Sequence, residues 1–552
     1  MKNNKPVLLH KNLKLFFVLF ILTFSATAKA QEIKFTKADT LRGSLDSKLR
    51  TCYDVKFYHL DLTIDLEKQF ISGSNEIWFT ALSNFKSLQI DLFRDLNIDK
   101  ILYNNKNLNF SREEGAVFVN FPKTLRKGVK AKFRIYYSGK PITAKNAPWD
   151  GGLIFSKDNN GNTFASVACQ GIGASSWWPN KDQLADKPDS MLISINIPKG
   201  KCMNVSNGQL RSVKEINGYK QYNWFVSYPI SNYNVAFNIG NYVHLKDHYQ
   251  GLNGDLNLNY YVLEQNAGKA KQHFDTNVKR TLEAFEYWFG PFPFYKDGYK
   301  LVETPYLGME HQTAIAYGNN FKNGYDGRDL SATGWGLKWD FIIVHESGHE
   351  WFGNNISCKD IADMWIHESF TTYAEGLFTE YWYGKQAGSE YIIGLRNNIL
   401  NNKPMLGIYG VNNEGSTDMY YKGANMLHTL RTILNNDLKW RSILIGLNEQ
   451  FRLKTVNSSD IINYINQRTG NDFTDFFDQY LKYVNIPKLE IRKENNLIFY
   501  RWNCEVKDFS MPLDVSIDGG EFQRIQATSD WQNIKGSDFK IKNDFYVNVV
   551  EI

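Results

Sequence analysis

The residues best suited to chemistry form a short motif with the spacing His-Glu-x-x-His. His345 and His349 are four positions apart, so on a helix both imidazoles stand on one face and can bind the same metal ion. Glu346 lies beside that face, where its carboxylate can act as a general base toward water. A catalytic zinc ion needs three protein ligands and one open position. Glu368, nineteen positions after His349, is the candidate third ligand, and we predict a hydrolytic zinc site.

The alternative is that these histidines are ordinary packing or surface residues. The chain has 10 histidines among 552 residues, and in such a chain His-Glu-x-x-His arises by chance in roughly one case in a hundred. The neighbouring residues favour a metal site, because an apolar run at 341–344 precedes the motif and Trp351-Phe352-Gly353 follows it. This pattern is typical of a buried helix that ends at a glycine.

The spacing of apolar residues predicts the elements that must position this motif. From about Cys52 to Val243, apolar and polar residues alternate, which is typical of strands with one buried face. Helical spacing begins near Gly268 and dominates to about residue 485, and alternation returns after Pro487. We expect a multidomain α+β fold with an N-terminal β-sandwich or saddle domain (31–246), a mainly helical catalytic domain (247–486) and a small C-terminal β-sandwich (487–552).

Residues 1–30 have the features of a secretory signal peptide. Lysines precede an apolar run at 15–24, and Ala28-Lys29-Ala30 precedes the expected cleavage site at Gln31. The absence of a cysteine after this site argues against a lipid anchor, and no other stretch is long enough to cross a bilayer. We therefore expect an exported protein, periplasmic or extracellular, without a stable membrane anchor.

Charge and cysteine content exclude some other functions. The formal charge of +6 includes five lysines of the predicted leader, which has no acidic residue, so the remainder carries +1. A nucleic acid or other polyanionic partner is therefore not indicated. The five cysteines are scattered without a Cys-x-x-Cys pair, so neither a structural thiolate-zinc site nor a particular disulfide is predicted.

Three motifs together resemble the aminopeptidase N and leukotriene hydrolase family of zinc metallopeptidases, in the gluzincin clan. The zinc motif continues into Trp351-Phe352-Gly353-Asn354, which is similar to the family's W-F-G-N. The segment 307–311, Leu-Gly-Met-Glu-His, is similar to the family's G-A-M-E-N exopeptidase motif, and Tyr420 opens a Y-x-K-G motif. The resemblance covers most of the chain after the leader. It implies a thermolysin-like catalytic domain with one zinc ion held by His345, His349 and Glu368.

The resemblance also implies roles for residues outside the zinc motif. Tyr420 would donate a hydrogen bond to the oxyanion that forms during peptide hydrolysis. Glu310 would pair with the free amine of the peptide, and Gln170 would be its partner from the N-terminal domain. Without the family, Tyr420 is one of 31 tyrosines that could simply pack, and Gln170 could be a surface amide.

Further residues are expected to complete the site. Gly308, Met309 and His311 would bind the substrate backbone by resemblance. Glu375 lies seven positions after Glu368, hence on the same helix face, and we expect it to hydrogen-bond and orient a zinc histidine. A solvated helix charge is the alternative for Glu375.

Departures from the family pattern leave the substrate open. His311 stands where the family motif has asparagine, and Leu307 stands where it has a small residue, so the preferred first residue and the choice between exopeptidase and endopeptidase action are not determined. The leading expectation is an exported zinc aminopeptidase that acts on peptides with a free N-terminus. Alternatives are a zinc endopeptidase, an epoxide hydrolase or a non-catalytic binding protein. The oligomeric state is not determined.

Overall fold

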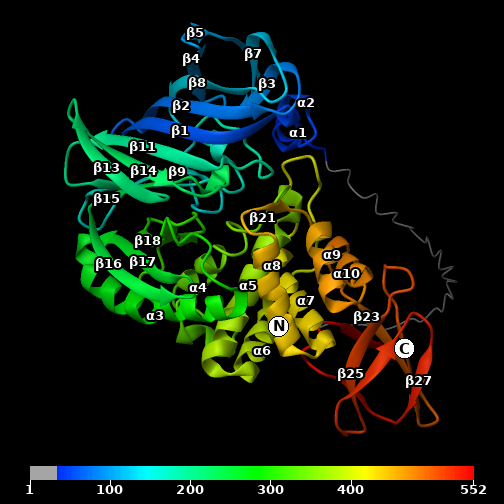
Figure 1. Cartoon of the computed structure of the whole chain (residues 1–552). Coiled ribbons are helices and arrows are strands. Elements are labelled where there is room, and N and C mark those ends of the chain that lie inside the picture. The colour runs from blue at the N-terminus through cyan, green and yellow to red at the C-terminus, as the bar shows by residue number, and fades with distance from the viewer. Residues whose placement is uncertain (1–33) are drawn as a thin grey trace, which may run out of the picture. The chain divides into compact units, whose positions relative to one another are not determined.

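The chain forms a β-rich region, a mainly helical region and a second β region in sequence order (Figure 1). The structure is a computed structural model that describes residues 34–552, so the predicted signal peptide lies outside the described residues. The predicted multidomain α+β fold class is confirmed. None of the described helices combines the length and apolar character needed to span a membrane.

The N-terminal region is built on a large sheet with the strand order β13-β14-β11-β1-β2-β8-β4-β5. Strand β1 shows why it forms: Leu60, Leu62 and Ile64 are fully buried while the residues between them are partly exposed. Strand β1 pairs antiparallel with β2 and parallel with β11. The strands of this sheet are β1 (Tyr53–Asp65), β2 (Phe70–Ala81), β4 (Leu96–Tyr103), β5 (Lys106–Asn107), β8 (Lys130–Gly139), β11 (Ser190–Pro198), β13 (Gln209–Ile216) and β14 (Tyr219–Val226).

Two smaller sheets and two short helices complete this region. One sheet has the order β3-β7-β6 and the other β12-β15-β10-β9. The second of these matters for function, because Gln170 follows the end of β10. Their bounds are β3 (Phe85–Asp91), β6 (Asn109–Glu113), β7 (Ala116–Leu125), β9 (Gly152–Lys157), β10 (Thr163–Ala168), β12 (Met203–Ser206) and β15 (Phe237–Gly240), with α1 (Lys37–Gly43) and α2 (Lys48–Thr51) before them.

A sheet of order β16-β17-β18-β20-β19 connects the N-terminal region to the helices. Its edge strand β19 is Gly308–Met309, the centre of the exopeptidase-like motif. The other strands are β16 (Tyr242–Gly251), β17 (Gly254–Leu263), β18 (Tyr299–Glu303) and β20 (Ile315–Tyr317). The domain boundary expected at residue 246 falls inside β16, and the boundaries stay predictions.

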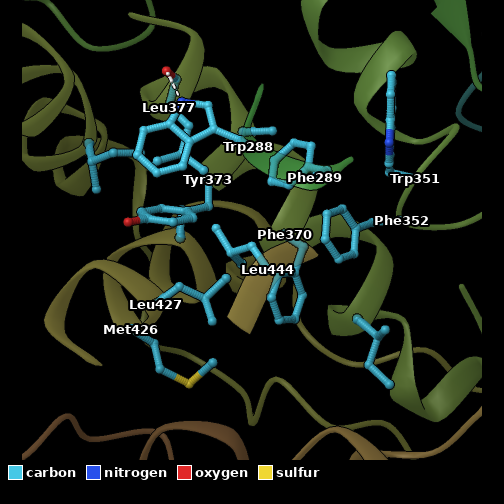
Figure 2. Close-up of a cluster of buried hydrophobic side chains, with 14 of the residues drawn as sticks. Trp288, Phe289, Trp351, Phe352, Phe370, Tyr373, Leu377, Met426, Leu427 and Leu444 are labelled. Carbon is cyan, nitrogen blue, oxygen red and sulfur yellow. Dashed lines mark hydrogen bonds between the residues drawn. The ribbon is translucent and has the colours of Figure 1, made fainter. Parts of the chain in front are cut away.

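The helices pack around an aromatic core (Figure 2). Trp288 and Phe289 come from the end of α3, Trp351 and Phe352 follow the motif, and Phe370 lies in α5. The rings of Phe352 and Phe370 stack with centroids 4.7 Å apart. The helices are α3 (Ala267–Phe289), α4 (Phe341–Gly348), α5 (Trp365–Tyr383), α6 (Lys385–Gly394), α7 (Asp418–Leu434), α8 (Asp437–Gln450), α9 (Ser458–Thr469) and α10 (Thr474–Lys482), with a small sheet of β21 (Ser357–Cys358) and β22 (Thr455–Val456).

The C-terminal region contains two small sheets, of order β27-β24-β23-β29 and β26-β25-β28. Tyr480 at the end of α10 donates a hydrogen bond to the carbonyl of Tyr546 at 2.5 Å, which ties this region to the helices. The strands are β23 (Lys488–Glu494), β24 (Leu497–Trp502), β25 (Met511–Ile517), β26 (Gln523–Ala527), β27 (Gln532–Lys535), β28 (Phe539–Ile541) and β29 (Asn548–Glu551).

Candidate active site

Helix α4 carries His345, and His349 follows directly at its C-cap. Asp340 caps the start of the helix: its carboxylate accepts a hydrogen bond from Ile343 N at 3.1 Å and satisfies a free backbone donor of the first turn. Asp340 also accepts a hydrogen bond from Tyr317 in β20 at 2.7 Å. The start of α4 is thereby fixed to the sheet that ends in β19.

The three predicted metal ligands converge. The Nε2 atoms of His345 and His349 are 3.3 Å apart, and Glu368 Oε2 lies 3.8 Å from the first and 3.4 Å from the second. All three side chains are at least nine-tenths buried. Two nitrogen ligands of a tetrahedral zinc ion, each about 2.0–2.1 Å from the metal, stand roughly 3.3 Å apart.

Hydrogen bonds on the far side of each imidazole direct its Nε2 atom toward this centre. His345 Nδ1 lies 2.7 Å from Glu375 Oε1, and Tyr391 donates to the other oxygen of Glu375 at 2.7 Å. His349 Nδ1 lies 3.0 Å from the carbonyl of Phe352. An imidazole whose Nδ1 donates to an oxygen presents Nε2 with a free lone pair, which is the form that binds a metal.

The donor set and its electrostatics fit a zinc ion. Within the described part of the chain, Glu368 Oε2 is a buried oxygen that accepts no hydrogen bond, as expected for an atom whose partner is a cation. Burial alone would lower the pKa of His349, but the negative charges of Glu368, Glu310 and Glu346 raise it to about 10. The cluster therefore attracts positive charge, which a bound dication would supply.

Glu346 lies next to this centre and packs against the backbone of β19. A Cβ atom at Gly308 would stand only 2.7 Å from Glu346 Oε1, so the glycine leaves the space that the carboxylate occupies. Burial raises the pKa of Glu346 to about 7, and a neighbouring cation would lower it. A carboxylate poised in this range can accept and return a proton.

Glu310 is held by two residues of the N-terminal region. Gln170 Nε2 donates to Glu310 Oε1 at 2.7 Å, and the Tyr233 hydroxyl donates to the same oxygen at 3.0 Å. Ligand atoms of Glu310, Glu346 and His349 lie within 4.8 Å of one another. The structure thus brings Gln170 and Glu310 together, although they are 140 positions apart in the sequence.

Tyr420, in the first turns of α7, completes the group. Its ring stacks on that of His345 with centroids 6.1 Å apart. Burial and the negative charge of Glu368 raise the pKa of the Tyr420 phenol well above its ordinary value, so the hydroxyl keeps its proton and can donate it in a hydrogen bond.

These residues line one cleft of about 410 Å³. The zinc-motif residues, Glu310, Tyr420 and Glu375 all contribute to its wall, as do Gln170, Leu307, Gly308 and Met309. The edge strand β19 forms part of this wall, so its backbone groups can meet an extended peptide.

His311 differs from its neighbours in β19. The expected contact of His311 with substrate stays a prediction, but its side chain is fully buried and does not line the cleft. The physical reason is the tight turn after Met309, in which His311 N donates to Met309 O at 2.9 Å and the chain leaves the cleft. His367, the residue before Glu368, accepts a hydrogen bond from Cys358 N at 2.8 Å.

Several residues of the site were not found from the sequence. Tyr233 and Tyr391 donate hydrogen bonds to Glu310 and Glu375, and Trp149 and Glu414 line the cleft. A single tyrosine, tryptophan or glutamate outside a motif carries no spacing signal, so only the fold reveals these four residues.

Comparison with known families agrees with this arrangement. Residues 54–234 match the family model described as the "Peptidase M1 N-terminal domain", and residues 274–480 match the "Peptidase family M1 domain". The two matches together cover more than half of the chain. The chain belongs to the M1 family of peptidases. The resemblance inferred from the motifs is therefore confirmed.

This M1 peptidase is distantly similar to curated proteins that are longer. "Probable aminopeptidase 2" of Sulfurisphaera tokodaii is 21% identical over 510 residues, which are 88% of this chain and 61% of that protein. "Aminopeptidase N" of Lactococcus lactis is 22% identical over 468 residues, 78% of this chain and 51% of that protein. The chain thus spans less than two thirds of these relatives.

A solved structure shares the fold. The M1 zinc metallopeptidase of Deinococcus radiodurans, a mutant of which was solved with a Tyr-Ser-Ala substrate, has a TM-score of 0.67 and 18% identity. The similarity covers 81% of this chain and 98% of that chain.

Proposed function

We propose that this protein is an exported zinc aminopeptidase that removes the first residue of peptides with a free N-terminus. The observation that carries the proposal is the position of Glu310. Its buried carboxylate lies within 4.8 Å of Glu346 and His349, so a peptide amine paired with Glu310 would leave only its first carbonyl near the metal ligands. The aminopeptidase names of its relatives and the tripeptide bound to the Deinococcus neighbour support the same function.

The proposed chemistry assigns one task to each group. When bound by His345, His349 and Glu368, zinc would lower the pKa of a water molecule to about 7 and polarise the substrate carbonyl. Glu346 takes the proton of the attacking water and returns it to the departing amine as the carbon–nitrogen bond breaks.

Two further groups hold the substrate during this step. The Tyr420 hydroxyl donates a hydrogen bond to the carbonyl oxygen as negative charge develops on it. Glu310 binds the ammonium group and sets which bond is cut. The backbone of β19 aligns the peptide as an added strand.

The leading test compares one aminoacyl reporter with a free amine and the same reporter with an N-acetyl group. We expect hydrolysis of the free form only, because acetylation removes the charge that Glu310 binds. Glu346→Gln should abolish turnover while the protein keeps about one zinc ion per chain by metal analysis. Equal cleavage of free and acetylated reporters would point to an endopeptidase, and activity that survives complete zinc removal would exclude the mechanism.

Export is the remaining part of the proposal, and it is supported only by the lysines, apolar run and Ala-x-Ala site of residues 1–30. Fractionation of cells that produce the full chain, with N-terminal sequencing of the product, tests it. We expect a mature chain that starts at Gln31 outside the cytoplasm.

A further inference from the structure

Glu414 is a cleft carboxylate with no part in the chemistry described above. The cleft wall contains five glutamates, and within the described residues it contains no lysine or arginine. Four of them have tasks: Glu310 binds the amine, Glu346 carries the proton, Glu368 is a ligand and Glu375 orients His345. Glu414 is left without one.

Nothing in the structure neutralises the Glu414 side chain. Among residues 34–552 it forms no hydrogen bond or ion pair, and it is exposed to the cleft. Desolvation, reinforced by the negative charge of Glu368, raises the pKa of Glu414 above its ordinary value. A cation placed beside this carboxylate would reverse that shift and gain a charge-assisted hydrogen bond.

The loop that presents Glu414 is held in place on both sides. Before it, Asn413 Oδ1 accepts a hydrogen bond from Ile408 N at 3.2 Å. After it, Gly415 lies so close to the carbonyl of Met405 that a Cβ atom would stand 1.7 Å from this oxygen. The carboxylate is thus presented by a fixed backbone, as a specificity residue requires.

The loop that carries Glu414 lies near the part of the cleft that would bind the first residue of a substrate. A hollow that adjoins the cleft is lined by Val411 and Asn412 together with Gln170 and Met364, and the last two also line the cleft itself. Gln170 Nε2 lies 3.8 Å from Met364 Sδ and bonds to Glu310. The loop therefore borders the cleft on the side where Gln170 holds Glu310, the carboxylate proposed to bind the free amine.

We propose that Glu414 gives this peptidase a preference for peptides whose N-terminal residue is lysine or arginine, with its carboxylate pairing with the cationic side chain. This inference rests on the proposed aminopeptidase function. The Trp149 ring, 71% exposed on the same cleft wall, offers an apolar and π surface that suits the stem or head of a long cationic side chain.

The test uses the zinc-loaded mature protein and three reporters with arginyl, citrullinyl and leucyl groups. Citrulline has nearly the shape of arginine but no charge, so the ratio of kcat/KM for arginyl over citrullinyl isolates the ion pair. We expect a ratio of about ten in the wild type, a ratio near one in Glu414→Gln, and a partial return in Glu414→Asp.

Glu449→Gln, which removes an exposed charge at the end of α8, is the matched control and should keep the wild-type ratio. Equal values for arginyl and citrullinyl reporters in the wild type, or an unchanged ratio in Glu414→Gln, would overturn the inference. If none of the three reporters is hydrolysed, the proposed function itself fails. Calorimetry then tests the role of Glu414 separately by comparing the affinities for L-arginine and L-citrulline. If the wild type binds L-arginine more tightly and Glu414→Gln loses this preference, the inference is supported. If the wild type binds both equally, the inference is refuted.

Discussion

At the scale of single residues, the absence of one side chain makes room for Glu346, the proposed general base. Gly308 faces Glu346, and a Cβ atom there would stand 2.7 Å from Glu346 Oε1 and 2.8 Å from Ile342 Cγ2. Both neighbours line the cleft, so an added methyl group would push the Glu346 carboxylate out of its place. Glu346 can therefore occupy this position only because residue 308 is a glycine.

Gly308→Ala should displace Glu346 and lower kcat by about 10- to 100-fold, since misplacing a catalytic group by about 1 Å has effects of this size. Zinc content should not change, because the three ligands are untouched. Steady-state kinetics and metal analysis measure both. Gly268→Ala in α3, where an added Cβ meets no atom within 4 Å, is the control and should be fully active. A fully active Gly308→Ala protein would show that Glu346 has another resting position.

At the scale of elements, the contact between α5 and α7 sets the distance between the third ligand and Tyr420. The helices touch where Gly423 meets Ser369, the residue after Glu368, and a Cβ atom at Gly423 would stand 1.9 Å from Ser369 Oγ. Ser369 Oγ donates to the carbonyl of Met419 at 2.7 Å. Lys422 Nζ donates to the carbonyl of Val484 at 2.8 Å and anchors α7 on its other side.

Gly423→Ala should lower the free energy of unfolding by about 1–3 kcal/mol, because overpacking at a tight helix contact forces the helices apart. Denaturant unfolding measures the change. The double variant Ser369→Gly with Gly423→Ala removes the serine side chain that the new methyl group would meet and should recover part of the loss. If the two effects simply add, the helices do not meet through these residues as described.

At the scale of the whole molecule, the site is complete only when the N-terminal and helical regions meet. Gln170 follows β10, Tyr233 lies in the 3-10 helix Asn232–Asn234, and both donate to Glu310 beside β19. The proposed recognition of the amine is thus shared between two regions, while the three predicted metal ligands all come from the helical region.

Tyr233→Phe should lower kcat/KM for peptides with a free amine by about tenfold, the value of a hydrogen bond to a charged group. The effect should nearly vanish when Glu310→Gln is already present, because both changes act on the same contact. Kinetics of the two single variants and the double variant give this coupling. Independent effects of the two changes would show that Tyr233 acts elsewhere.

The sequence predicted those features that depend on local spacing. The alternation of Leu60, Leu62 and Ile64 indicated a strand because side chains in a strand point to alternate faces. The interval between His345 and His349 indicated a shared ligand because helical residues four apart lie on one face. The same reasoning predicted that Glu375 lies on the helix face of Glu368, and in the structure its Oε1 lies 2.7 Å from His345 Nδ1.

What only the tertiary structure decided depends on contacts between distant segments. The pairing of Gln170 with Glu310, the support from Tyr233 and the place of Glu414 in the cleft wall all depend on how loops of different regions meet, and no periodicity records this. His311 illustrates the limit, because its neighbours in the motif line the cleft while the turn after Met309 buries its side chain. By itself the sequence predicted a metal-binding helix with a proposed base beside it, since both follow from backbone periodicity, and long-range packing alone decided which residues surround that helix.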